Sequence, residues 1–203
     1  MKLLSSLLLC AGMVVANLGF AQAADEPEQK IADATAKLLV TIADHQATFD
    51  QDPGSYFAAL DQQLAELVDF DFIAVNVMGN YRKAATPEQR DKFTQVFRAS
   101  LIETYGRGLI SYNNQTIELI PSGEPVSDSR KVTVRQVIKG GDGDVPLEYT
   151  VARKKDSTDW KVINVVINGI NLGKTFRNQF MQSAQKNGGD IDAVIAGWTA
   201  EGV

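Results

Sequence analysis

Few side chains in this 203-residue sequence could perform nucleophilic or metal chemistry. The one histidine, His45, falls on a polar part of a predicted helix, where a histidine is usually solvated. The one cysteine, Cys10, lies in the apolar segment that begins the chain. Zinc sites need several His or Cys ligands, and Ser–His and Cys–His nucleophiles need a positioned histidine. The sequence therefore argues against zinc sites and against both kinds of nucleophilic catalysis.

Two acidic motifs have plain structural interpretations. Asp69-Phe70-Asp71 has the spacing of a phosphatase-like motif, but the residues before it predict a helix rather than the apolar strand this chemistry needs. We expect a helix boundary with a capping aspartate. Residues 140–144, GGDGD, lack the glutamate of a calcium loop and the lysine of a phosphate loop, so we predict a hairpin turn. A pair of carboxylates suited to glycoside hydrolysis stays an open alternative, because the sequence does not show which residues are neighbours in space. We predict no catalytic residue and no metal site.

The first 23 residues have the pattern of a secretory signal peptide. Lys2 gives a positive start, residues 3–20 are apolar, and Ala21-Gln22-Ala23 is a small-x-small cleavage site. We predict cleavage after Ala23 and a single domain over residues 24–203. Cys10 leaves with the signal peptide, and an exported chain without disulfides suits a bacterial periplasm. The net charge of −5 argues against nucleic-acid binding, which selects basic patches.

Helical periodicity dominates the first half of residues 24–203. Apolar residues recur at helical spacing over residues 27–48, and a second helix begins at Asp52-Pro53, a typical N-terminus. Thr86-Pro87-Glu88-Gln89 fits a capping box and begins a third helix. This helix is predicted to end at Gly106 or Gly108.

After Tyr112 apolar residues recur at every second position, which predicts an antiparallel meander of four strands. The first three strands cover residues 115–120, 131–138 and 145–154, and the fourth lies in the apolar run of residues 160–176. Two short helices close the chain. The predicted fold class is α+β: a curved four-stranded antiparallel sheet packed against a helical layer. The inside of such a half-cone is often a pocket.

The fourth strand is apolar on both faces, and residues 162–173 carry no charge. It is too short for a membrane-spanning helix, which needs about 20 apolar residues. Either both faces pack on protein or one face meets an apolar ligand. Side chains alternate along a strand, and we assign the face without asparagine to the ligand side. That face carries Ile163, Val165 and Ile167, and the other carries Val162, Asn164 and Val166.

Two longer segments resemble those of a known family. Residues 77–106 contain a glycine before an aromatic segment, a Thr-Pro-Glu-Gln-Arg helix start, Phe-x-x-x-Phe-Arg and a tyrosine before a glycine. Residues 160–180 contain Trp-Lys-Val, an apolar strand, a glycine and Arg-x-x-Phe, and GGDIDAVI follows. In this order, and with the signal peptide, the segments resemble the MlaC family, also called toluene-tolerance or phospholipid-binding proteins. Asn164, Asn168 and Asn171 stand where that family often has two acids and a serine.

The resemblance implies a nuclear-transport-factor-like cone with an apolar cavity that holds the tails of a phospholipid. It implies a non-enzymatic periplasmic carrier that maintains the lipid asymmetry of the outer membrane. The implied partners are an outer-membrane lipoprotein–porin complex and an inner-membrane ABC transporter complex with its periplasmic lipid-binding subunit. Phospholipid is the cargo, no cofactor is expected, and the protein should be a monomer.

The predicted lipid-binding residues are apolar and aromatic positions of the matching segments and of the strand faces. They are Val75, Met78, Tyr81, Phe93, Phe97, Leu101, Tyr105, Val134, Tyr149, Val151, Ile163, Val165, Ile167, Ile170, Phe176 and Phe180. Spacing alone favours packed core for the stripe of Phe93, Phe97 and Tyr105. Two alternatives stay open: a cone-fold isomerase or hydrolase acting on an apolar substrate, and an adaptor or chaperone with a solid core.

Overall fold

The computed structural model describes residues 26–111, 115–123, 129–140 and 143–200. The predicted signal peptide and its cleavage site lie outside these residues, as do two residues of the predicted GGDGD turn. Within the described part of the chain, no helix is both long enough and apolar enough to cross a membrane.

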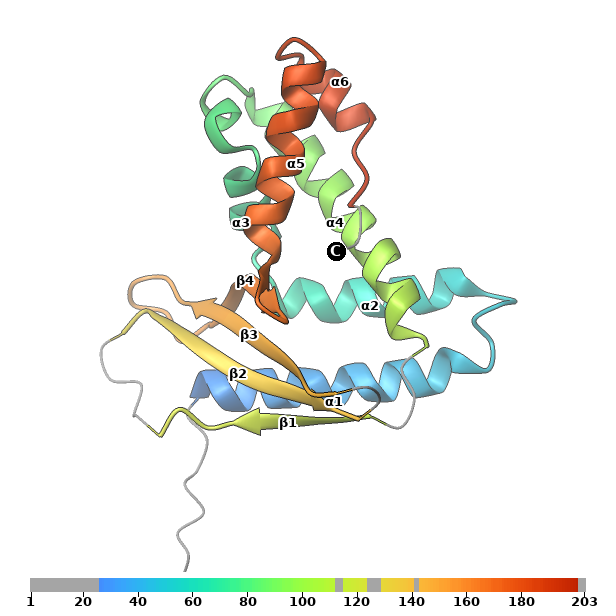
Figure 1. The fold of residues 1–203 in the computed structure, drawn as a ribbon. Coiled ribbons are helices and arrows are strands. Elements are labelled where there is room, and N and C mark those ends of the chain that lie inside the picture. Colours follow the sequence, from blue (N-terminus) through green and yellow to red (C-terminus); the bar gives the residue numbers. More distant parts are fainter. Residues whose placement is uncertain (1–25, 112–114, 124–128, 141–142, 201–203) are drawn as a thin grey trace, which may run out of the picture.

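Helices α1 (Glu26–Gln46) and α2 (Pro53–Leu67) form an antiparallel pair alongside the sheet (Figure 1). The predicted cap of α2 is confirmed, since the Asp52 carboxylate accepts the Ser55 N–H at 3.1 Å. An N-cap of this kind satisfies a backbone donor that has no partner inside the helix.

Helices α3 (Phe70–Val77) and α4 (Pro87–Leu109) follow, with a 3₁₀ turn, η1 (Gly79–Lys83), between them. Asp69 caps α3 by accepting the Phe72 N–H at 3.0 Å, which confirms the helix-boundary interpretation of that motif. Both hydrogen bonds of the predicted capping box at the start of α4 are present. The predicted end of α4 is wrong, because the helix continues through both glycines to Leu109.

The sheet contains β1 (Thr116–Ile120), β2 (Lys131–Lys139), β3 (Val145–Ala152), β4 (Lys161–Ile167) and the two-residue β5 (Ile170–Asn171). The strands are antiparallel and follow chain order across the sheet. The α+β class and the curved antiparallel sheet are confirmed, with one short strand more than predicted. Asn168 and Gly169 join β4 to β5 with φ of 49° and 80°, the left-handed conformation of a tight hairpin turn.

A bulge in β4 corrects the predicted assignment of its faces. Val165 pairs with Tyr149, but Val162 pairs with Val151, so Ile163 is an extra residue in the ladder. Val162 therefore shares the inner face with Val165, and it is buried there. The prediction that Ile163 lies on that face and Val162 on the other is wrong, since strict alternation fails across a bulge.

Helices α5 (Leu172–Lys186) and α6 (Ile191–Ala196) pack with α3 and α4 into a helical group that stands away from α1 (Figure 1). Three apolar clusters of the described residues hold the fold together. We call them the helical cluster, between α3, α4, α5 and α6; the sheet cluster, between the inner face of the sheet, α1 and the end of α2; and the α1–α2–α4 cluster.

Candidate ligand cavity

A cavity of about 710 Å³ lies beside α1 and α2, against the inner face of the sheet. This volume is within the range of roughly 300–1,000 Å³ that is usual for sites that bury a small ligand. The apolar part of its wall comes from both helices, from β3 and from the residue before β4. These residues are Ile31, Ala34, Leu38, Leu64, Leu67, Tyr149 and Trp160.

Charged residues of both signs surround the cavity. Glu26, Asp33 and Lys37 of α1 and Glu66 of α2 are exposed at its rim. Lys30, also on the rim, is paired with Asp159 at 2.7 Å. A rim of mixed charge offers no concentrated positive site for one particular anionic group.

Trp160 forms part of the cavity wall. Its side chain is 1% exposed, and its indole N–H donates to the Glu26 carboxylate at 3.4 Å. The Arg153 guanidinium stacks over the indole at 4.9 Å from the ring centre. With the Lys30–Asp159 ion pair, these contacts fix the segment between β3 and β4 against the start of α1.

Tyr149 is the phenolic group of the cavity wall. It occupies the middle of β3, opposite Val134 of β2 and Val165 of β4. Burial raises the pKa of Tyr149 to about 12, because the ionised phenolate would lose its hydration. The side chain nevertheless keeps some accessible surface, as expected for a group that is surrounded by protein and faces a hollow. Tyr149 is therefore a neutral hydroxyl rather than a general base at physiological pH.

A larger groove of about 910 Å³ lies on the other side of the β4 bulge, between the start of α3, α4 and the end of β3. Ile163 lines it, but so do Asp69, Asp71, Asp91 and several cationic residues. Arg98, also in its wall, makes a two-pronged ion pair with Asp61, with distances of 2.6 and 2.7 Å. Because charges line this groove, the smaller cavity is the better site for an apolar ligand.

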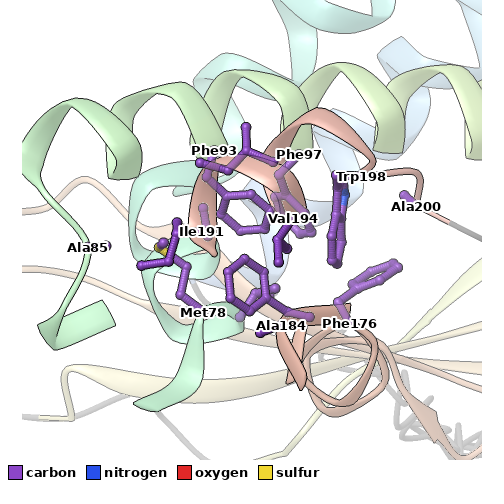
Figure 2. Packing of buried hydrophobic residues seen from close by; sticks show 14 residues of the cluster. Met78, Ala85, Phe93, Phe97, Phe176, Ala184, Ile191, Val194, Trp198 and Ala200 are labelled. Carbon is purple, nitrogen blue, oxygen red and sulfur yellow. The ribbon is translucent and has the colours of Figure 1, made fainter. Parts of the chain in front are cut away.

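Half of the predicted lipid-binding residues lie in the helical cluster. Met78, Phe93, Phe97, Phe176 and Phe180 are buried there, and Tyr81, Leu101 and Tyr105 pack against them. Figure 2 shows Phe93, Phe97 and Phe176 gathered around Trp198, and the Phe93 and Trp198 rings meet edge to face at 5.1 Å. These rings form a closed core, and contact with lipid stays a prediction for them.

The other predicted residues lie on or near the sheet, except for Val75 of α3. Val134 and Val151 are buried in the sheet cluster, and Tyr149 and Val165 pack against it. Ile167 pairs with Leu147 on the inner face, whereas Ile170 of β5 is 43% exposed. Of the sixteen predicted residues, Tyr149 is the one that contributes to the wall of the apolar cavity.

The sequence-based prediction missed most of the cavity wall. Ala34, Leu38, Leu64 and Leu67 belong to the apolar stripes of α1 and α2, which periodicity does identify. Periodicity cannot show whether such a stripe meets protein or a hollow. Gln136 was also missed: it is 2% exposed on the inner face of the sheet, where its amide bonds the Thr35 hydroxyl at 3.1 Å.

Two buried polar groups have no hydrogen-bond partner among the described residues: the Tyr105 hydroxyl and the Trp198 indole N–H. Burial raises the pKa of Tyr105. Trp198 belongs to the helical cluster, where it packs on Phe97, and Tyr105 packs against the cluster at Phe176. The described residues also contain no group of three His, Cys, Asp or Glu side chains placed to hold a metal ion.

Comparisons with known proteins place the chain in a family. The sequence model of one family, described as "MlaC protein", matches residues 32–200. This chain belongs to the MlaC family. It is 36% identical over 181 residues to the toluene tolerance protein Ttg2D of Pseudomonas putida, an alignment covering 88% of this chain and 82% of that protein.

Two further MlaC-related proteins extend the comparison. The intermembrane phospholipid transport system binding protein MlaC of Haemophilus influenzae is 29% identical, over 83% of this chain and 78% of its own length. A phospholipid-binding protein of Ralstonia solanacearum, solved in complex with a phospholipid, has a TM-score of 0.72 and 29% identity. The match covers 85% of this chain and 94% of that one, so the MlaC family fold extends over almost all of the described residues.

Proposed function

We propose that this protein is a periplasmic phospholipid carrier that shuttles lipid between the outer and inner membranes. The observation that carries the proposal is the apolar cavity between α1, α2 and the sheet in a member of the MlaC family. The relatives named for phospholipid binding and intermembrane phospholipid transport support it.

The energetics of a lipid tail explain why a carrier needs such a cavity. Two tails of about 15 methylenes each, at ~0.8 kcal/mol per methylene, would cost on the order of 24 kcal/mol to expose to water. The free energy of moving the same tails from a bilayer into an apolar cavity is close to zero, because the tails stay out of water. Lipid can therefore be taken up and delivered without a covalent step, and the direction of net transport is set by energy from a partner.

The mixed charge of the rim bears on headgroup selection. The Lys30 ammonium forms an ion pair with the Asp159 carboxylate. Three further carboxylates, those of Glu26, Asp33 and Glu66, lie close to the cavity. Tails supply the binding energy, so we expect the purified protein to carry phospholipids with several headgroups. Organic extraction and mass spectrometry of the purified protein test this. A single headgroup species, unrelated to its abundance in the host membrane, would contradict it.

A substitution that fills the cavity gives the sharper test. Ala34 lines the cavity, whereas Ala36, on the same helix, is exposed. We expect Ala34→Trp to reduce bound phospholipid several-fold while the protein stays folded, and Ala36→Trp to keep the wild-type amount. The readouts are lipid per protein by mass spectrometry and the melting temperature. Equal lipid content in both variants would place the cargo elsewhere.

The proposed partners are an outer-membrane lipoprotein–porin complex and an inner-membrane ABC transporter complex with its periplasmic lipid-binding subunit. A protein of net charge −5 has little attraction for anionic lipid surfaces, so delivery should depend on protein contacts. We expect no stable flotation with anionic liposomes when no partner is present. Tight flotation of the isolated protein would count against handover between proteins.

A further inference from the structure

Tyr149 differs from the other polar groups near the inner face of the sheet because its hydroxyl is unused. Gln136 on the same face bonds Thr35. In the α1–α2–α4 cluster, the buried Tyr56 hydroxyl donates to the Gly106 carbonyl at 3.1 Å. The Tyr149 hydroxyl has no hydrogen-bond partner among the described residues. Unlike the Tyr105 hydroxyl and the Trp198 indole N–H, it is not fully enclosed by protein. It therefore reaches the hollow that the Tyr149 side chain lines.

Apolar side chains flank Tyr149 on the sheet and on α2. Its strand neighbours are Val134 and Val165, and the facing cavity wall includes Leu64 and Leu67 of α2. When acyl chains fill the hollow, the hydroxyl loses its hydrogen bonds to water and gains none from the protein. An occupant of the cavity that offers an acceptor oxygen at this depth would restore the lost hydrogen bond.

We propose that the Tyr149 hydroxyl donates a hydrogen bond to an ester carbonyl oxygen of the bound lipid and so makes the cavity selective for ester-linked chains. This inference rests on the proposed function. Ester carbonyls are uncharged acceptors at the junction of the tails and the headgroup, whereas the phosphate carries a charge that the apolar wall would exclude. Tyr149 stays protonated at every physiological pH, because burial raises its pKa to about 12, so it is always available as a donor.

The test compares two lipids in two proteins. Delipidated wild-type protein and the Tyr149→Phe variant are titrated with two phosphatidylcholines of identical chain length, one ester-linked and one ether-linked. We expect the wild type to bind the ester lipid about five- to tenfold more tightly, the value of one net hydrogen bond. We expect Tyr149→Phe to bind both lipids alike, at the affinity of the wild type for the ether lipid.

The outcomes separate this inference from the proposed function. If the wild type binds neither lipid, the carrier function itself fails. If the wild type binds both lipids equally, or if Tyr149→Phe keeps the preference, the role of Tyr149 is overturned. A free fatty acid of the same length provides a third arm. Displacement of the ester lipid by the acid in the wild type, but not in Tyr149→Phe, would assign the hydroxyl to a carboxyl group and contradict the ester assignment. Equal binding of the two lipids by the wild type overturns the role of Tyr149 even if the variant does not fold.

Discussion

The three asparagines in the last part of the apolar run have structural tasks. The Asn164 side-chain oxygen accepts the Gly173 N–H at 3.1 Å, and that of Asn171 accepts the Lys174 N–H at 3.0 Å. Both donors belong to the first turn of α5, whose backbone N–H groups lack partners inside the helix. Asn168 occupies the turn between β4 and β5. The polar residues that interrupt this apolar strand thus hold the first turn of the helix that follows it.

Substitutions of Asn164 test this interpretation. Asn164→Ala should lower the free energy of unfolding by about 1 kcal/mol, because the Gly173 N–H loses its acceptor. Asn164→Asp should keep the acceptor and gain from the positive end of α5, so its stability should match or exceed that of the wild type. Urea denaturation of the three proteins measures the difference. Equal destabilisation by both substitutions would show that the hydrogen bond has no role.

At the scale of elements, the contact between α2 and α4 depends on one glycine. Gly106 is buried, and a Cβ placed there would lie 2.8 Å from Leu60 Cδ1 and 3.1 Å from the Phe57 ring. Gly108, two residues later in the same helix, has nothing within 4 Å of such a Cβ. The two glycines therefore form a matched pair.

Alanine should act in opposite directions at these two positions. Gly108→Ala should stabilise the protein by up to ~1 kcal/mol, the usual gain in helix propensity. Gly106→Ala gains the same propensity but pushes into a packed core, and we expect a net loss of roughly 1–2 kcal/mol. Thermal melts and urea titrations of both variants measure the sign of each change in the free energy of unfolding. A stabilised Gly106→Ala would mean that α2 and α4 separate at little cost.

The elements themselves followed from local patterns in the sequence, but the position of the cavity did not. Caps at Asp52, Asp69 and Thr86 and the alternation along β2 and β3 are properties of a few adjacent residues, and each was predicted. The Asn168-Gly169 turn carried an equally local signal for β5. The bulge at Ile163 and the hollow behind Ala34 depend on how strands and helices meet across the fold, which no local period encodes.

The aromatic stripe of α4 shows the same distinction. Phe93 and Phe97 have the spacing of any buried helix face, and family resemblance suggested lipid contact for them. In the structure, Phe176, Phe180 and Trp198 fill the space before them. Which partner covers a stripe is decided by segments about 80 to 100 positions away, so spacing could not decide it.

At the scale of the whole molecule, buried tyrosines make stability sensitive to alkaline pH. Burial raises the pKa of Tyr149 and of Tyr56 to about 12, from the ordinary tyrosine value of 10.0. Between pH 10 and about 12 the unfolded chain therefore binds fewer protons than the folded protein. The stabilising contribution is fully present below pH 10 and is lost as the pH rises through this window.

The Tyr149→Phe variant isolates one part of this effect. Between pH 10 and 12 the free energy of unfolding of the wild type should fall by about 2 kcal/mol more than that of Tyr149→Phe. Tyr56 is present in both proteins, so its contribution cancels. Urea titrations at several pH values provide the measurement. Parallel pH profiles for the two proteins would show that Tyr149 is hydrated in the folded state.

The contacts that hold Trp160 against α1 also bear on the order in which the protein assembles. Lys30 and Asp159 are 129 positions apart in the sequence, and Glu26 and Trp160 are 134 apart. Loops of this length close late, after the local helices have formed. In a chain that emerges from its N-terminus, α1 and α2 appear first, and the part of their apolar surface that lines the cavity meets Tyr149 and Trp160 only when these residues arrive. The surface that lines the cavity is thus exposed during folding, and a folding helper that covers α1 and α2 would protect the nascent chain from aggregation.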